Sequence, residues 1–361
     1  MKKQILACAV AAAFATGAVA ADVSIYGTVD TGFNFGYSKV KGEESTKSFK
    51  LDSGISGPTR WGIKGGEDLG NGYSVSFDLQ SGFDADTGTL GQNGRLFGRE
   101  ARLTVAGPFG ELSFGRMGCL TSAAGTYDIF QGYADIYDGG WGTANSAIGV
   151  KNFFYSRDRY DNMTTYATPT VAGVKGYAQY SFNLDGQEAE GNERNNTRYA
   201  GVGLTYENGP LAVVAVYDTI LYKNDATAPK KDARAVSVGG SYDFGVAKVF
   251  AAYQYGKNET MIGAEDFGNQ LKAHNAHLGV AVPVCAGTLN VGAYYTTAKA
   301  VDNSDLKLKV YDVAATYTYP LSKRTSVYAG VGYAQTKNEL TAGENTKTKA
   351  FDSAIGLAHS F

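Results

Sequence analysis

Proline, cysteine and histidine are scarce in this chain, with 7, 3 and 3 copies among 361 residues. Cys119 and Cys285 are far apart and are the only cysteines after the first 20 residues, which excludes a fold built on disulfides. His274, His277 and His359 supply neither a metal-ligand spacing nor a base beside a nucleophile, and no Gly-x-Ser-x-Gly motif occurs. We therefore expect no enzyme, no metal site and no cofactor.

Two further absences concern charge and hydrophobicity. The 33 Lys and Arg residues are scattered singly against 35 Asp and Glu, so the sequence indicates no nucleic-acid partner. Beyond the N-terminal segment there is no run of 18 apolar residues that could form a membrane helix. The mean hydropathy of -0.22 fits a soluble protein, but it also fits a transmembrane barrel, in which only alternate strand residues face lipid.

The N-terminal segment has the features of a secretory signal peptide. Lys2 and Lys3 precede a mostly apolar run over 5–14, and Ala18 and Ala20 form an A-x-A cleavage site. We predict a signal peptide at 1–20 and one mature barrel domain at 21–361.

Most of the mature chain alternates between apolar and polar residues. Runs at 73–80, 236–244 and 311–319 have a period of two, which predicts half-buried β-strands. Seven tight turns, centred near positions 70, 108, 170, 209, 245, 285 and 322, are spaced 36 to 40 residues apart, except for one interval of 62. Seven turns divide the chain into eight hairpins and therefore sixteen strands.

Longer polar connections lie between these turns, at 39–50, 184–197, 223–233, 258–272, 301–308 and 337–349. Short turns on one rim and long loops on the other are typical of bacterial outer-membrane barrels. In the final run, Phe351, Ile355, Leu357 and Phe361 share one face. An open sheet edge cannot exist in lipid, so this last strand should pair with the first. The predicted fold is an all-β, multi-pass, 16-stranded antiparallel transmembrane β-barrel.

The anomalous interval contains the segment 119–149, where alternation stops for about thirty residues rich in Gly, Ala, Tyr and Asp. Loops of this length are usually functional or disordered. Its aromatic and aliphatic content is higher than a solvated linker needs. We predict one long loop that folds into the barrel and narrows its lumen.

Four short motifs and the terminal Phe361 suggest a family. They are SIYG at 24–27, RWGIKGGEDLG at 60–70, LFGREA at 96–101, and Gly115-Arg116 before the long segment. With them, essentially the whole mature chain resembles the general diffusion porins of Gram-negative bacteria. The resemblance implies a homotrimer of 16-stranded barrels in outer-membrane lipid, each with its own water-filled pore. It also implies that Phe361 is the signal read by the barrel-assembly machinery.

In that family the third external loop presents carboxylates, and cations on the opposite wall complete a charged constriction. By motif, Arg60 and Arg116 match the wall arginines, and Arg157 or Arg159 is the third. Simple strand parity would place Arg116 on the outer face, so its assignment requires a bulge or a strand that ends at Gly115. Alternation places Lys64 on the same face as Arg60, although either could instead be a solvated lumen charge.

The loop carboxylates are Asp128, Asp135 and Asp138. The segment reads IYDGG at 136–140 instead of the family's Pro-Glu-Phe-Gly-Gly, which makes Asp138 a less secure assignment than Asp135. For each of the three, loop capping or turn formation is the alternative role.

The predicted function is passive diffusion of ions and small hydrophilic solutes, with a slight preference for anions because wall cations outnumber loop acids. The alternative is a channel selective for one sugar or organic acid, with loop aromatics such as Tyr127, Tyr133, Tyr137 and Trp141 along the path. An adhesin is a third possibility. Saturable conductance block by one solute would favour the selective channel.

Overall fold

The computed structural model describes residues 22–122, 125–134, 157–191, 193–226, 229–262, 265–339 and 345–361. The predicted signal peptide at 1–20 lies outside these ranges. Within them, no helix is both long and apolar enough to cross a membrane.

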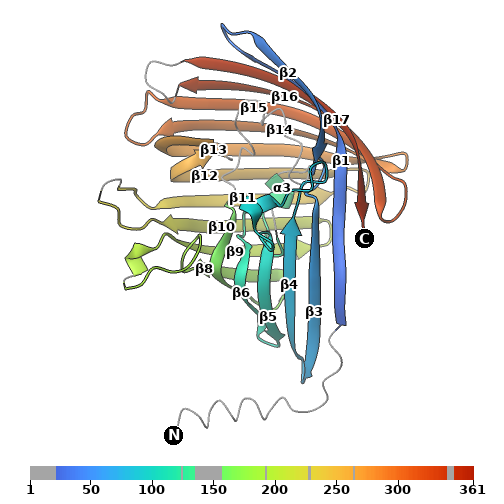
Figure 1. Cartoon of the computed structure of the whole chain (residues 1–361), viewed down its shortest axis with the longest axis vertical. Coiled ribbons are helices and arrows are strands. Elements are labelled where there is room, and N and C mark those ends of the chain that lie inside the picture. The colour runs from blue at the N-terminus through green and yellow to red at the C-terminus, as the bar shows by residue number, and fades with distance from the viewer. Residues whose placement is uncertain are drawn as a thin grey trace.

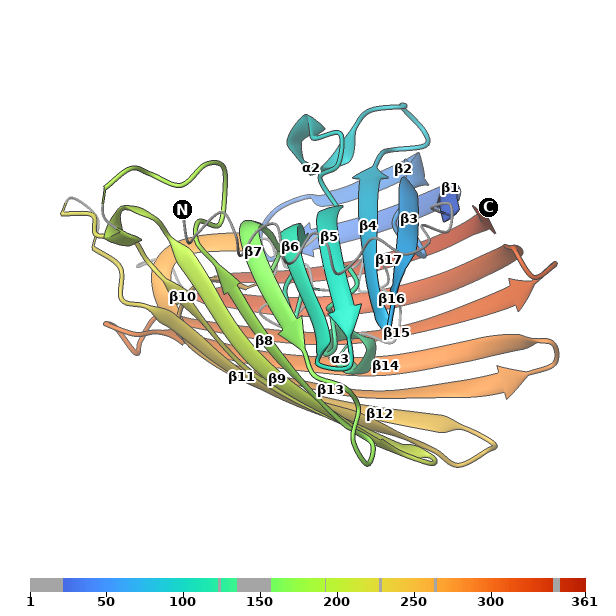
Figure 2. The ribbon, with the colours of Figure 1, turned by 90° about the horizontal axis from the view of Figure 1, so that it is seen from below.

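Antiparallel strands form nearly all of the described chain, and Figure 2 shows them as two curved halves, β3–β9 and β11–β17, around a common interior. The strands are β1 (Asp22–Val40), β2 (Ser45–Ser53), β3 (Arg60–Gly70), β4 (Tyr73–Gly82), β5 (Glu100–Gly107), β6 (Gly110–Gly118), β7 (Arg159–Ala167), β8 (Val174–Ser181), β9 (Arg198–Asn208), β10 (Leu211–Leu221), β11 (Ala233–Asp243), β12 (Lys248–Ile262), β13 (Glu265–Val284), β14 (Gly287–Ala300), β15 (Lys307–Pro320), β16 (Thr325–Glu339) and β17 (Thr346–Ser360). Two one-turn helices, α2 (Gly91–Gly94) and α3 (Gln131–Ala134), and a short 3-10 helix (Glu193–Asn195) lie in the connections.

The sheet closes on itself as predicted. β1 pairs with β17, which sets Phe33 opposite Ile355 and Tyr37 opposite Phe351. β2 and β3 both pair with β1 along successive parts of its length, so together they occupy one position in the wall. The seventeen strands therefore form a sixteen-position antiparallel barrel.

All seven predicted tight turns separate consecutive strands. The long connections are less regular than predicted, because strands extend into several of them: β12 continues to Ile262 and β13 begins at Glu265, within the expected loop 258–272. Polar residues can continue a backbone ladder beyond the apolar zone, so a loss of hydrophobic alternation does not mark the end of pairing.

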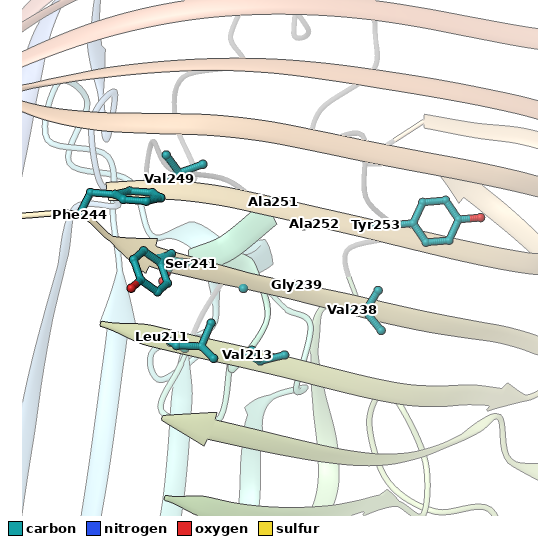
Figure 3. A pocket seen from close by; sticks show the side chains of 13 residues that line it. Leu211, Val213, Val238, Gly239, Ser241, Phe244, Val249, Ala251, Ala252 and Tyr253 are labelled. Carbon is teal, nitrogen blue, oxygen red and sulfur yellow. The ribbon is translucent and has the colours of Figure 1, made fainter. Parts of the chain in front are cut away.

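The two faces of the wall differ as alternation requires. On β11, Val236 and Val238 are 45% and 42% exposed, whereas Ser237 between them is fully buried on the inner side. A recess of about 540 Å³ lies on the wall at β10–β12, and Figure 3 shows the apolar side chains that line it, including Leu211 and Phe244. A continuous apolar outer surface of this kind is typical of a barrel in lipid.

The interruption between β2 and β3, residues 54–59, is organised by a buried carboxylate on β1. Asp30 accepts hydrogen bonds from the N–H groups of Ser56 (3.0 Å) and Gly57 (2.9 Å), and from the Tyr328 hydroxyl on β16. Near the end of this interruption, the Pro58 carbonyl accepts a hydrogen bond from Arg60 Nη1 at 3.1 Å. This hydrogen bond fixes the side chain of Arg60, the first residue of β3.

Candidate pore lining and constriction

One row of charged residues crosses the inner wall from β3 to β5. Lys64 lies opposite Asp78, and Asp78 lies opposite Arg102. The Arg102 guanidinium is 3.7 Å from Asp78 and 3.3 Å from Glu100, while Lys64 Nζ lies 4.9 Å from the centre of the Tyr26 ring. Cross-strand pairing of opposite charges stabilises this row and fixes its side chains along the wall.

A hydrogen-bonded chain connects this row to the residue that precedes β5. The Tyr26 hydroxyl donates to Asp78 at 2.6 Å, and Gln80 Nε2 donates to the Tyr26 oxygen at 2.9 Å. Arg99 Nε then donates to Gln80 Oε1 at 2.6 Å. A Cβ at Gly82 would lie 3.1 Å from Arg99 Cδ and closer still to Gln92, so the missing side chain leaves room for the arginine.

Arg99 belongs to a group of three arginines with Arg60 and Arg159, which we call the arginine cluster. Arg99 is only 6% exposed. Its burial, followed by the positive charges of Arg159 and Arg60, lowers the pKa of Arg99 to about 9. Together with Lys64 and Arg102, the cluster places five cations near three acids, Asp78, Glu100 and Asp158.

The described start of the long segment lies against inward-facing residues on both sides of the barrel. Near β5 and β6, the Thr126 N–H donates to Glu100 at 2.7 Å, and the hydroxyls of Tyr127 and Ser113 are 2.5 Å apart. On the other side, α3 contacts β11, β12 and β13, and the Tyr133 carbonyl oxygen lies 2.9 Å from His277 Nδ1. Residues 135–149 lie outside the described ranges, so a lumen narrowed by the whole segment stays a prediction.

Comparisons with known proteins agree with this architecture. The sequence model of a family described as Gram-negative porin matches residues 7–339. The chain belongs to the Gram-negative porin family. It is 34% identical to an outer membrane porin protein of Bordetella pertussis and 28% identical to outer membrane porin protein 32 of Delftia acidovorans, over the full length of both chains in each case. Among solved structures it is similar to an anion-selective porin from Comamonas acidovorans, with a TM-score of 0.70, 23% identity, and coverage of 94% of this chain and all of that one.

The family and the closed barrel establish what the protein does. It is an outer-membrane porin whose sixteen-stranded wall encloses a channel for passive diffusion. Within the described ranges of the porin, no group of three or more His, Cys, Asp and Glu side chains could hold a metal ion.

The two candidates for the third wall arginine lie in different surroundings, and a constriction role for either stays a prediction. Arg159 joins the arginine cluster. Arg157 is buried against acidic residues of β10 and β12, with its Nε 2.7 Å from Asp218 and its Nη1 2.7 Å from Glu259. The porin thus uses Arg157 to anchor the chain that follows the long segment.

Arg116 has partners other than the loop carboxylates. It lies opposite Ala101, donates through Nε to the Gly98 carbonyl at 2.8 Å, and pairs with Asp161 at 2.7 Å. A bulge is present where the sequence required one, since Gly115 has a φ of +127° and the register shifts beside it. The charge of Arg116 is nevertheless neutralised by Asp161, and a constriction role for it remains a prediction.

Only one of the three predicted loop carboxylates lies within the described residues. Asp128 Oδ1 accepts hydrogen bonds from the N–H groups of Phe130 (3.2 Å) and Gln131 (3.1 Å) at the start of α3, which is the capping role named as its alternative. Asp135 and Asp138 lie outside the described residues, as do Tyr137 and Trp141.

Two wall cations, Arg99 and Arg102, were missed at the sequence level. Alternation from Glu100 could have identified Arg102, because the two share a face of β5. Arg99 precedes the strand, where parity no longer predicts direction, and the LFGREA motif that contains it was the only available signal.

Proposed function

We propose that the porin passes small anions in preference to cations, past a positive wall formed by the arginine cluster with Lys64 and Arg102. The observation that carries this proposal is the arginine cluster itself, three guanidiniums whose acidic neighbours are Glu100 and Asp158, with Asp158 3.4 Å from Arg159. Arg159 Nε is buried and has no hydrogen-bond acceptor among the described residues. The solved porin from Comamonas acidovorans, which has a similar fold, is itself anion-selective.

The mechanism is electrostatic. The apolar wall has a low dielectric constant and focuses the field of these cations into the lumen, which raises the local anion concentration. Asp135 and Asp138 are proposed to face the cluster across the lumen, so that the transverse field orients dipolar solutes and disfavours apolar ones. No step of catalysis is proposed.

Assembly follows the family pattern in this proposal. The mature chain, after removal of 1–20, forms a homotrimer surrounded by outer-membrane lipid, with Phe361 presented to the barrel-assembly machinery. The end of the chain supports that role, because Phe361 and Gly27 exchange backbone hydrogen bonds of 3.0 and 3.1 Å while the Phe361 side chain stays 46% exposed.

The test is the reversal potential of the porin in planar bilayers under a salt gradient. We expect anion preference at pH 7 for the wild type, and a weaker anion preference for an Arg99→Gln variant, which lacks one cation of the cluster. Cation preference at pH 7 would refute the proposal.

A further inference from the structure

A second cavity of the porin, of about 460 Å³, lies beside the short turns that join β9 to β10 and β11 to β12. Its volume is within the range of small-molecule sites, roughly 300–1,000 Å³. Tyr133 of α3 lines it, and α3 contacts the wall at β11, β12 and β13, as Figure 1 shows for β11. A Cβ at Gly239 of β11 would lie 3.1 Å from Tyr133 Cβ, so the helix packs directly on this strand. We call this cavity the turn-side pocket.

Four neighbouring strands supply the floor and the sides of the turn-side pocket. Glu207 of β9 lies opposite Ala212 of β10, and Ala212 lies opposite Ser241 of β11. One same-face position nearer the turn, Asp243 of β11 lies opposite Lys248 of β12. All five residues line the pocket and have the parity of the buried residues on their strands, so they face the lumen. The small side chain of Ala212 leaves the space between Glu207 and Ser241 open.

Charges of opposite sign lie at the two ends of this pocket. Among the described residues, neither Glu207 nor Lys248 forms an ion pair. Asp243 accepts a hydrogen bond from the Gly245 N–H at 2.7 Å, and no ion pair joins it to Lys248 despite their register. Lys248 Nζ lies instead 5.3 Å from the centre of the Phe250 ring. Each end of the pocket can therefore bind a group of opposite charge.

Another inward-facing pair on the same rim shows a different arrangement. Glu111 follows the short turn between β5 and β6, and Lys175 follows the turn between β7 and β8. Their side chains pair at 3.2 Å. Opposite charges near the short turns can thus neutralise each other, whereas the turn-side pocket keeps Glu207 and Lys248 apart.

The Ser241 hydroxyl lies between these two charges along the wall. Ser241 is only 5% exposed, and its Oγ has no hydrogen-bond partner among the described residues. A buried hydroxyl without a partner is unfavourable. Rotation about the Cα–Cβ bond can turn it toward a bound solute without breaking a hydrogen bond. The pocket therefore offers a carboxylate, a hydroxyl and an ammonium in order across the strands.

We propose that the turn-side pocket binds a small zwitterionic solute of the free α-amino acid type. The ammonium of the solute binds Glu207, and its carboxylate binds Lys248 and the Ser241 hydroxyl. Its apolar part lies against Tyr133 and Pro210. Fixed charges of both signs favour a solute that carries both charges over one that carries only one of them, because the latter leaves one end of the pocket without a partner.

The position of the pocket gives it a role in solute release. Short turns lie at the periplasmic end of outer-membrane barrels. A solute held there has already passed the constriction and leaves directly into the periplasm. The proposal depends on the barrel and on the described side chains, and not on the anion preference proposed above.

The experiment measures binding of L-leucine to the full mature porin in non-ionic detergent by saturation-transfer NMR. Leucinamide, which lacks the carboxylate, and N-acetyl-leucine, which lacks the ammonium, are the comparison solutes. The pocket variants are Glu207→Gln and Lys248→Gln. The matched controls, Glu111→Gln and Lys175→Gln, remove the same charge types from the paired residues on the same rim. Single-channel conductance of each variant verifies that the barrel has folded.

We expect each pocket variant to bind leucine about tenfold more weakly than the wild type, which is the usual effect of losing one hydrogen bond to a charged group. Both control variants should bind leucine as the wild type does. Lys248→Gln should leave the binding of leucinamide unchanged, and Glu207→Gln should leave that of N-acetyl-leucine unchanged, because each analogue lacks the group that the altered residue holds.

Two results would overturn the proposal. One is an equal loss of leucine binding in the pocket and control variants, and the other is an equal loss of leucine and leucinamide binding in Lys248→Gln. If leucine binding follows the expected pattern in a porin whose reversal potential shows cation preference, the pocket is supported and only the proposed anion preference is refuted.

Discussion

Replacing Arg60, Arg99 and Arg159 together with glutamine should move the reversal potential of the porin from the anion side to the cation side. The triple variant keeps Lys64 and Arg102 against Asp78, Glu100 and Asp158, so the net positive charge of this wall disappears. Focused fields of this kind change local ion concentrations by about tenfold or more, and we expect the anion-to-cation permeability ratio to fall by at least that factor. The measurement is a planar-bilayer reversal potential under a potassium chloride gradient.

Arg116→Gln is the matched control, because it removes the same charge type from the adjacent strand. Arg116 is already paired with Asp161, so its loss should change the permeability ratio by less than about twofold. If Arg116→Gln changed the permeability ratio as much as the triple variant does, our assignment of selectivity to the arginine cluster would be wrong. The prediction from the sequence motif, which places Arg116 in the constriction, would then be supported.

The second large effect should come from Arg157→Met. Arg157, Asp218 and Glu259 have side chains that are 4%, 1% and 4% exposed, so removal of the cation leaves two buried carboxylates without their main counterion. Breaking a buried ion pair from one side costs about 3–5 kcal/mol. We expect a clear decrease in the urea concentration at the midpoint of unfolding in detergent. Unfolding is monitored by the loss of the gel mobility that is typical of the folded barrel.

A compensated variant separates charge from packing. Replacing all three residues, as Arg157→Met/Asp218→Asn/Glu259→Gln, should recover most of the lost stability because no unpaired charge remains. As a control, Lys231→Gln removes an exposed cation whose pairing distance to Asp302 is 3.6 Å, and should change the unfolding midpoint little. If the compensated variant were no more stable than Arg157→Met, the ion network would not be the cause.

The sequence predicted the barrel well because the alternation of apolar and polar residues follows from the two different faces of the wall. Val236 and Val238 alternate with Ser237 since one face meets lipid and the other does not, and the turns interrupt that pattern at regular intervals. The interruption at 54–59 between β2 and β3 was not predicted, because it depends on Asp30 of β1. This carboxylate accepts hydrogen bonds from N–H groups of a segment more than 20 residues away. Pairing between distant segments leaves no trace in local alternation.

The candidate site was predicted less completely for the same reason. Arg60 and Lys64 follow from parity within β3, but Arg99 and Arg159 stand beside the ends of strands, where loop geometry sets their direction. Arg157 and Arg159 have the same parity and could not be separated by it. Only the position of Asp218 and Glu259 on distant strands decides that Arg157 is an anchor.

The most direct test of the central claim is to locate anions in the pore. Crystals of the porin grown in sodium bromide would report them through the anomalous scattering of bromine. The account predicts a bromide at the arginine cluster, within hydrogen-bond reach of its guanidiniums. Bromide found only at external loops, with none at the arginine cluster, would contradict it.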